Sequence, residues 1–261
     1  MISFIVAAYN EAGNIGPTVE TIRSACRACD LDGYEIIIVD DGSSDSTSDE
    51  ITALAGIFSC ITGVKNSMNL GLGASIRKGI EMASHPAFMV VPGDNDMPES
   101  MILMMLQFRY EADVILTAPL NKEQRNLTRN IISMLYQMAY MIVFKVSVSY
   151  INGPGIWPTH AARNAQLKAQ RFSIIAELNV KALRMGSTFA EVPGYFQAGP
   201  KVRSTVTLRN LTEVIVSFVR LTLDVHIARR EQFNKRSRRM QINFVSYFSG
   251  RKTTNLPHQG I

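Results

Sequence analysis

Short apolar segments alternate with helix-like segments through the first 120 residues, and this alternation limits the folds open to the chain. The apolar segments are rich in β-branched residues, as buried parallel strands are. They lie at 2–8, 35–39, 60–64, 87–92 and 113–117, with helical patterns near 14–29, 45–55, 72–84 and 98–108. The pattern predicts an α/β fold, with a Rossmann-like, mostly parallel central sheet flanked by helices.

The second half of the chain is less regular. A polar and basic stretch at 121–129 leads into an apolar helix at 131–145, and glycines and prolines at 152–158 predict irregular structure. A helix at 172–185, a strand near 187–193 and C-terminal amphipathic helical sequence at 207–231 are expected to follow. Past Asn234 the sequence lacks clear periodicity, so we expect a frayed tail.

The composition is that of a folded protein without disulfide support. Apolar residues make up 46% of the 261 residues and charged residues 19%, which excludes a mainly disordered or fibrous chain. Three cysteines without a second CxxC pair argue against a zinc ribbon and favour a reducing cytoplasm. The first residues read as a strand and not as a signal peptide. The apolar run 131–144 is shorter than the roughly 20 residues that span a bilayer, so we expect no transmembrane helix.

Charge is distributed unevenly along the chain. Residues 1–200 hold 15 Lys or Arg against 19 Asp or Glu, whereas residues 201–261 hold 12 against 3, within a net charge of +5. A basic tail of this kind is typical of proteins that bind an anionic partner, either a membrane or a nucleic acid. A solvated helix end followed by a loose tail explains the same charges equally well.

Polar residues follow three of the predicted strands. Ala7 to Glu11 follow the first, Val39 to Asp45 the second, and Pro92 to Asp96 the fourth. Open α/β sheets bind ligands at the carboxyl ends of their strands. A tyrosine can stack on a nucleobase, and two aspartates one residue apart can hold a divalent cation against a pyrophosphate. Each element alone is also explained by an acidic turn, a helix cap or a packed tyrosine, but their placement after neighbouring strands favours a shared site.

The order of these motifs resembles that of family 2 glycosyltransferases and, within them, the dolichyl- or polyprenyl-phosphate sugar synthase branch. The motifs are Ile5 to Glu11 (IVAAYNE), Glu35 to Thr47 (EIIIVDDGSSDST), Asn69 to Ala74 (NLGLGA) and Gly93 to Asp96 (GDND). They cover about residues 1–120. The likeness continues more weakly to about residue 215, through Ala176-Glu177 and Glu191-Val192-Pro193.

The resemblance implies a GT-A fold that binds a nucleotide-sugar and inverts its anomeric centre. It divides the chain into a nucleotide-sugar-binding half (1–120), an acceptor-side half of the same catalytic domain (121–232) and a basic, flexible tail (233–261). The nucleotide-sugar site it implies consists of Ala7, Tyr9, Glu11, Val39, Asp41, Asn95, Asp96, Lys201 and Arg203. Asp94 and Asp96 would bracket Mg²⁺ or Mn²⁺, which would offset the charge on the departing diphosphate.

The chain departs from the family pattern at two places. The synthases commonly carry a glutamine two residues after the second aspartate, where this chain has Pro98, so one potential metal ligand is missing. The family's late basic loop is blurred here, although Lys201 and Arg203 keep the charge that clamps a diphosphate. The chain also has Ala7 where the family often has proline, a mild change.

The acceptor side is defined less sharply. Glu177 matches an acidic family position and would act as a general base for a sugar hydroxyl, as a positioning residue if the acceptor is an ionised lipid phosphate, or as an ordinary solvent-facing glutamate. Arg125 and Arg129 share one helical face and suit an acceptor phosphate. The methionine-rich helix 131–145 suits either a lipid surface or a buried core. Trp157 and His160 border the Gly-Pro loop, where packing is the simpler role.

The sequence thus predicts a metal-assisted, inverting glycosyltransferase of cell-envelope glycan biosynthesis, cytoplasmic or peripheral on the cytoplasmic membrane face. Its donor would be UDP- or GDP-linked and its acceptor a lipid phosphate or a glycan, with no nucleic-acid partner. The alternatives are a nucleotidyltransferase, whose Gly- and Lys-rich phosphate loop is missing here, and a non-catalytic membrane-surface protein with a degenerate site. The base, the sugar, the acceptor and the oligomeric state stay open.

Overall fold

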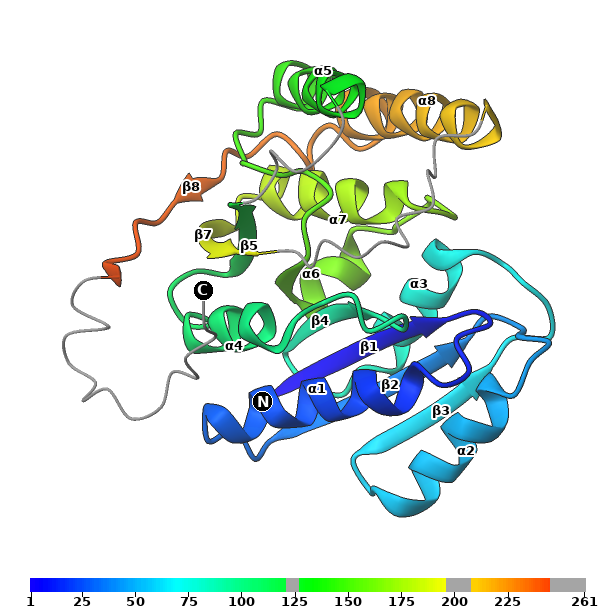
Figure 1. Ribbon diagram of the computed structural model, residues 1–261. Helices are drawn as coiled ribbons and strands as arrows, with labels where there is room; N and C mark the ends of the chain where they lie inside the picture. Colours follow the sequence, from blue (N-terminus) through cyan, green and yellow to red (C-terminus); the bar gives the residue numbers. More distant parts are fainter. Residues whose placement is uncertain (121–126, 196–207, 245–261) are drawn as a thin grey trace.

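The computed structural model describes residues 1–120, 127–195 and 208–244 (Figure 1). One eight-stranded sheet forms its centre, in the order β3-β2-β1-β4-β6-β5-β7-β8. The strands are β1 (Ile2–Ala8), β2 (Tyr34–Asp40), β3 (Ile61–Lys65), β4 (Ala87–Pro92), β5 (Val114–Pro119), β6 (Gly155–Pro158), β7 (Thr188–Gly194) and β8 (Arg238–Arg239). Only β6 runs antiparallel to its neighbours among the described strands. The predicted α/β class with a mostly parallel sheet is therefore confirmed.

Helices cover both faces of this sheet, because successive strand residues point to opposite sides. Phe4 and Val6 of β1 pack with one set of helices, α1 (Ile15–Ala28), α2 (Thr47–Ile57) and α4 (Glu99–Gln107). Ile5 packs with the other set, which includes α3 (Leu72–Met82), α6 (Thr159–Asn164) and α7 (Ser173–Arg184). The long apolar runs of β1 and β4 are thus buried on both faces.

Two further helices, α5 (Leu127–Phe144) and α8 (Leu208–Leu223), lie side by side in an outer layer beyond α7 (Figure 1). They pack through aromatic rings, with centroids 5.0 Å apart for Tyr140 and Phe218. After α8 the chain continues into a π-helical turn, η2 (Asp224–Ala228). None of the described helices combines the length and the apolarity needed to cross a membrane.

Helix α5 has the core role that its sequence allowed, and contact with a lipid surface stays a prediction. Tyr140 and Phe144 belong to the buried core, whereas other apolar side chains of the outer layer are exposed. These exposed residues, called here the outer-layer apolar residues, are Ile132, Met134, Leu135, Met138, Met141 and Ile142 of α5, Ile215, Val216, Val219 and Leu223 of α8, and Ile227 of η2.

The structure corrects two expectations. The stretch 152–158 contains β6, a four-residue strand that follows Pro154, ends at Pro158 and is too short to leave a periodic signal. The sequence also predicts a frayed tail past Asn234, but β8 pairs with β7, and Met240 N donates to Phe189 O at 2.7 Å. The alternating apolar residues Met240, Ile242 and Phe244 then pack on the core.

Candidate functional site

A cavity of about 540 Å³ opens at the carboxyl ends of β1, β2 and β4. Six of the residues predicted from the sequence line it together: Ala7, Tyr9, Glu11, Asp41, Asp94 and Asp96. They come from three strand ends separated by up to about 90 residues of chain. The sheet order places β1 between β2 and β4, so the three loops converge on one rim.

The loop after β1 is fixed by the loop after β2. Asn10 N donates to Ser43 Oγ at 2.9 Å, and Glu11 N donates to Thr47 Oγ1 at 2.8 Å. Asn10 adopts a positive φ of 55°, a conformation that asparagine tolerates better than most residues. These bonds hold the backbone directly after Tyr9, whose side chain is 46% exposed at the cavity.

Asp41 holds the loop that precedes α3. Its buried carboxylate accepts hydrogen bonds from Asn66 Nδ2 at 2.9 Å, Leu70 N at 3.0 Å and Gly71 N at 2.7 Å. Gly71 has a φ of 92°, and a Cβ there would lie 2.6 Å from Gln170 O, so glycine is required. Asp41 therefore combines a place on the cavity wall with a structural role in the Asn69–Gly71 turn.

Asp94 and Asp96 form an acidic turn at the cavity. Asp96 N donates to Asp94 Oδ1 at 3.1 Å, and both carboxylates remain exposed. Partial burial and the charge of Asp94 raise the pKa of Asp96. Burial also raises the pKa of Glu11; the hydrogen bond from Asn14 opposes this shift, and the charges of Asp94, Asp45 and Asp96 add to it. The site thus concentrates negative charge that a cation would relieve.

This donor set suits a hard divalent cation. Among the described residues, no three His, Cys, Asp or Glu side chains gather into a set able to hold a metal ion by themselves. Mg²⁺ is usually held by one or two carboxylates together with substrate phosphates and water. The residues present therefore fit an ion that arrives with a phosphorylated ligand.

Two predicted site residues do not line the cavity. Val39 is completely buried between Ile37 and Ala83, because its side chain points into the sheet face that α3 covers. Asn95 has a φ of 58°, and its Oδ1 accepts a hydrogen bond from Thr21 Oγ1 of α1 at 3.0 Å. The turn between the two aspartates therefore directs the Asn95 amide toward α1.

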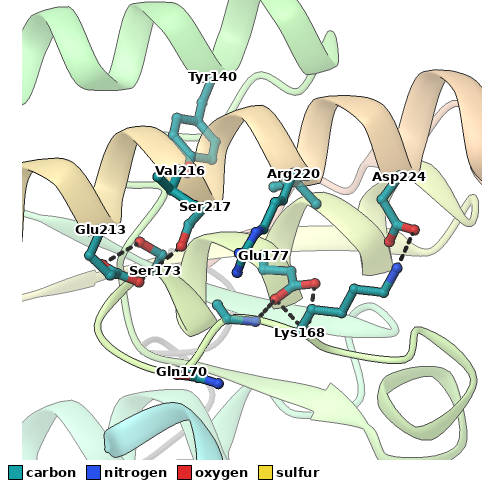
Figure 2. A pocket seen from close by; sticks show the side chains of 12 residues that line it. Tyr140, Lys168, Gln170, Ser173, Glu177, Glu213, Val216, Ser217, Arg220 and Asp224 are labelled. Carbon is teal, nitrogen blue, oxygen red and sulfur yellow. Dashed lines mark hydrogen bonds and ion pairs between the residues drawn. The ribbon is translucent and has the colours of Figure 1, made fainter.

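Glu177 also lies outside this cavity and is not solvent-facing. It is buried on α7, beside a separate cavity of about 80 Å³ that α5, α7 and α8 enclose (Figure 2). Its carboxylate accepts hydrogen bonds from Lys168 N at 2.9 Å and Ala169 N at 2.7 Å, and forms an ion pair with Lys181. These contacts occupy the lone pairs that a general base would need.

The remaining sequence candidates divide into two groups. Arg125, Lys201 and Arg203 lie outside the described residues, as does the side chain of Arg129. Trp157 has the expected packing role: it is fully buried, and its Nε1 donates to Asn179 Oδ1 at 2.7 Å. His160 is exposed on α6 and does not line the cavity.

A second wall of the cavity escaped the sequence analysis. It is formed by Tyr150, Asn152, Pro154, Arg171, Phe172 and Ile175. Because β6 is antiparallel, the residues that precede it arrive at the rim where the parallel strands end. Glu191, of the Glu-Val-Pro motif in β7, fixes this approach by accepting from Ser149 N at 2.5 Å. An arginine and an aromatic residue at the start of the predicted helix 172–185 were the available signal for Arg171 and Phe172.

Known proteins share sequence with this chain. The sequence profile described as Glycosyl transferase family 2 matches residues 3–168. An undecaprenyl-phosphate 4-deoxy-4-formamido-L-arabinose transferase of Serratia proteamaculans is 31% identical over 143 residues, which are 53% of this chain and 44% of that protein. The chain spans about half the length of the curated relatives it matches.

Solved structures share the fold. Glucosyl-3-phosphoglycerate synthase of Mycobacterium tuberculosis, crystallised with Mg²⁺ and UDP, superposes with a TM-score of 0.60 at 16% identity, covering 85% of this chain and 79% of that one. TarS of S. aureus in complex with UDP-GlcNAc gives a TM-score of 0.53 at 15% identity, covering 88% of this chain and 69% of that one. The predicted GT-A type of fold is confirmed.

Proposed function

Since the chain belongs to glycosyl transferase family 2, we propose that it is an inverting glycosyltransferase that moves a sugar from a nucleotide-diphospho-sugar to a lipid-phosphate or glycan acceptor. One observation carries the proposal: residues from three strand ends, including Tyr9, Asp41, Asp94 and Asp96, line a single cavity of about 540 Å³. This volume lies within the usual range for small-molecule sites of about 300–1,000 Å³.

The donor would occupy the first wall of the cavity. Tyr9 offers an exposed ring for the nucleobase, and Asp41 stands beside it. Asp94 and Asp96 would hold Mg²⁺ or Mn²⁺ against the diphosphate. Bound there, the cation would supply charge neutralisation for the departing nucleoside diphosphate. A solved structure of the same fold contains UDP and Mg²⁺, which supports the use of a divalent cation together with a nucleoside diphosphate.

The acceptor would enter from the second wall. Its oxygen would attack the anomeric carbon on the face opposite the diphosphate, forming the new C–O bond as the bond to the diphosphate breaks. A lipid phosphate is already ionised at neutral pH and needs no strong base. Glu177 is committed to backbone and Lys181 contacts, which agrees with an acceptor of that kind. The Serratia relative is named for undecaprenyl phosphate.

A lipid acceptor requires contact with a membrane. The outer-layer apolar residues supply exposed hydrophobic side chains, with Ile142 71% and Ile227 72% exposed. Basic residues, including Arg230 and Arg236, follow η2 and would favour anionic headgroups. These features support our proposal that the protein is peripheral on the cytoplasmic face of a membrane.

Calorimetric titration with UDP and with GDP, each with and without Mn²⁺, tests the proposal. We expect one nucleoside diphosphate to bind, with an affinity that rises at least tenfold when Mn²⁺ is present. Binding that ignores the metal would remove Asp94 and Asp96 as cation ligands. Failure of both nucleotides to bind would favour a non-catalytic membrane-surface protein, and preferential binding of a nucleoside triphosphate would favour a nucleotidyltransferase.

A further inference from the structure

Arg171 supplies positive charge to an otherwise acidic cavity. The cavity lining includes the carboxylates of Glu11, Asp41, Asp94 and Asp96, and Arg171 is its one Lys or Arg within the described part of the chain. Arg171 is half-buried, and no ion pair joins it to any other described residue. A guanidinium kept apart from carboxylates, in a cavity of this size, is available to an anionic ligand.

The loop that carries Arg171 is held from two sides. On the α7 side, Glu177 accepts hydrogen bonds from Lys168 N and Ala169 N. On the α3 side, Gly73 N donates to Gln170 O at 2.8 Å, and the Arg77 guanidinium donates to Ala169 O. The loop is therefore fixed before any ligand arrives, which reduces the entropy lost when Arg171 engages one.

The contact between this loop and α3 requires the two backbones to approach closely. A Cβ on Gly73 would lie 2.2 Å from Ala169 O, so a larger residue would push the loop away from α3. The same loop leads directly into α7, whose N-cap residue Phe172 and first-turn residue Ile175 line the cavity. The positive end of a helix dipole thus adjoins Arg171 and adds to the attraction for an anion.

We propose that Arg171 binds phosphate oxygens of the substrate in this cavity, and that Glu177 is the positioning residue that holds its loop in place. The proposal deepens the proposed function and rests on it. The planar guanidinium can donate two parallel hydrogen bonds to one phosphate group. That phosphate belongs either to the diphosphate of the donor or to the acceptor, and the two sources are separated by experiment.

The experiment compares the wild-type chain with Arg171→Ala and Arg171→Lys. Binding of UDP and GDP in the presence of Mg²⁺ is measured by calorimetry, and binding of decyl phosphate is measured by the same method. Arg27→Ala is the matched control, because Arg27 is exposed on α1 beside Glu20 and does not line the cavity. Thermal unfolding checks that each variant is folded, and Arg171→Lys serves if Arg171→Ala is not.

We expect Arg171→Ala to lower the binding affinity for one of these ligands by roughly tenfold to a hundredfold, because a charge-assisted hydrogen bond is lost. Arg171→Lys should recover only part of the affinity, because an ammonium cannot donate in the bidentate geometry. Weaker nucleotide binding assigns Arg171 to the donor diphosphate, and weaker decyl phosphate binding assigns it to the acceptor. Wild-type affinity for both ligands in Arg171→Ala would overturn the proposal, whereas a wild type that binds no nucleotide would overturn the proposed function instead.

The role of Glu177 is tested by Glu177→Gln, which keeps the size of the side chain. If Glu177 positions Arg171, this variant should weaken the same ligand as Arg171→Ala, and adding Arg171→Ala to it should cause little further loss. Equal and independent losses in the double variant would contradict the positioning role.

Discussion

The ammonium group of Lys181 lies 2.8 Å from the carboxylate of Asp224, and both side chains are almost completely buried. Lys181 also pairs with Glu177, one turn earlier on α7. Asp224 begins the π-helical turn after α8, where it meets Lys168 and Arg229 as well. One buried network of charges therefore joins the outer layer to the loop that leads into the cavity wall (Figure 2 shows the Lys168–Asp224 pair).

Lys181→Met should destabilise the protein strongly. The substitution leaves Glu177 and Asp224 buried without their shared counter-ion, and losing one partner of a buried ion pair costs about 3–5 kcal/mol. Urea unfolding measures this change. Lys145→Met is the control, because Lys145 is exposed, and its free energy of unfolding should change by no more than about 0.5 kcal/mol. Equal stability of the two variants would contradict this account of the network.

Acid should weaken the fold through Asp224. Burial alone would raise the pKa of this carboxyl, but hydrogen bonds from Arg229, Lys181 and Lys168 outweigh it and hold the pKa well below its ordinary value. In the unfolded chain, an aspartate carboxyl has a pKa of about 3.9. The stabilisation is therefore complete above that pH and is lost as the pH falls toward the native pKa.

Asp224→Asn tests this pH dependence. The variant should be less stable than the wild type at pH 7, yet its free energy of unfolding should fall less steeply between about pH 5 and pH 2. Urea unfolding across this range gives both curves. If the curves of variant and wild type run parallel, the acid sensitivity arises elsewhere.

Asp96→Asn should remove the cation dependence of nucleotide binding. The amide keeps the shape of the side chain but loses the charge that Mg²⁺ or Mn²⁺ requires. We expect a loss of at least tenfold in the affinity measured with Mn²⁺ and little change without it. Asp49→Asn, on the exposed first turn of α2, should behave like the wild type. An unchanged response to Mn²⁺ would exclude Asp96 as a ligand.

Binding to membranes should depend on the outer layer. In flotation with vesicles that contain anionic phospholipid, Ile142→Glu and Ile227→Glu should each reduce the bound fraction, because burying an isoleucine contributes about 1.5–3 kcal/mol. Ile57→Glu provides a matched control: this residue is 70% exposed but lies on α2, on the other face of the sheet. A wild type that stays unbound at low salt would contradict the membrane contact.

The sequence predicts the first half of the fold well because its signals are local. Strands such as β1 and β4 are continuous apolar runs, and the loops that follow them carry recognisable polar residues. Six candidate residues from the motifs that follow these strands therefore line one cavity. Val39 and Asn95 differ because side-chain direction depends on the neighbouring helices α3 and α1, which no local pattern encodes.

The second half is harder to predict because its roles depend on distant contacts. Glu177 has the same helical spacing whether it faces solvent, a ligand or the backbone of Lys168. Arg171 gains its place at the cavity from the packing of its loop on Gly73, nearly a hundred residues earlier. Strand β6 is too short to be periodic, and its direction is set only by pairing with β4 and β5.

The reversed direction of β6 has an evolutionary consequence. The first wall of the cavity is complete by Met97, and the second wall begins only at Tyr150. One wall of the cavity can therefore be exchanged in evolution while the other wall is kept. If the first wall binds the nucleobase, as proposed, a chimera joined between these two residues should keep the nucleotide preference of the parent that supplies the first wall.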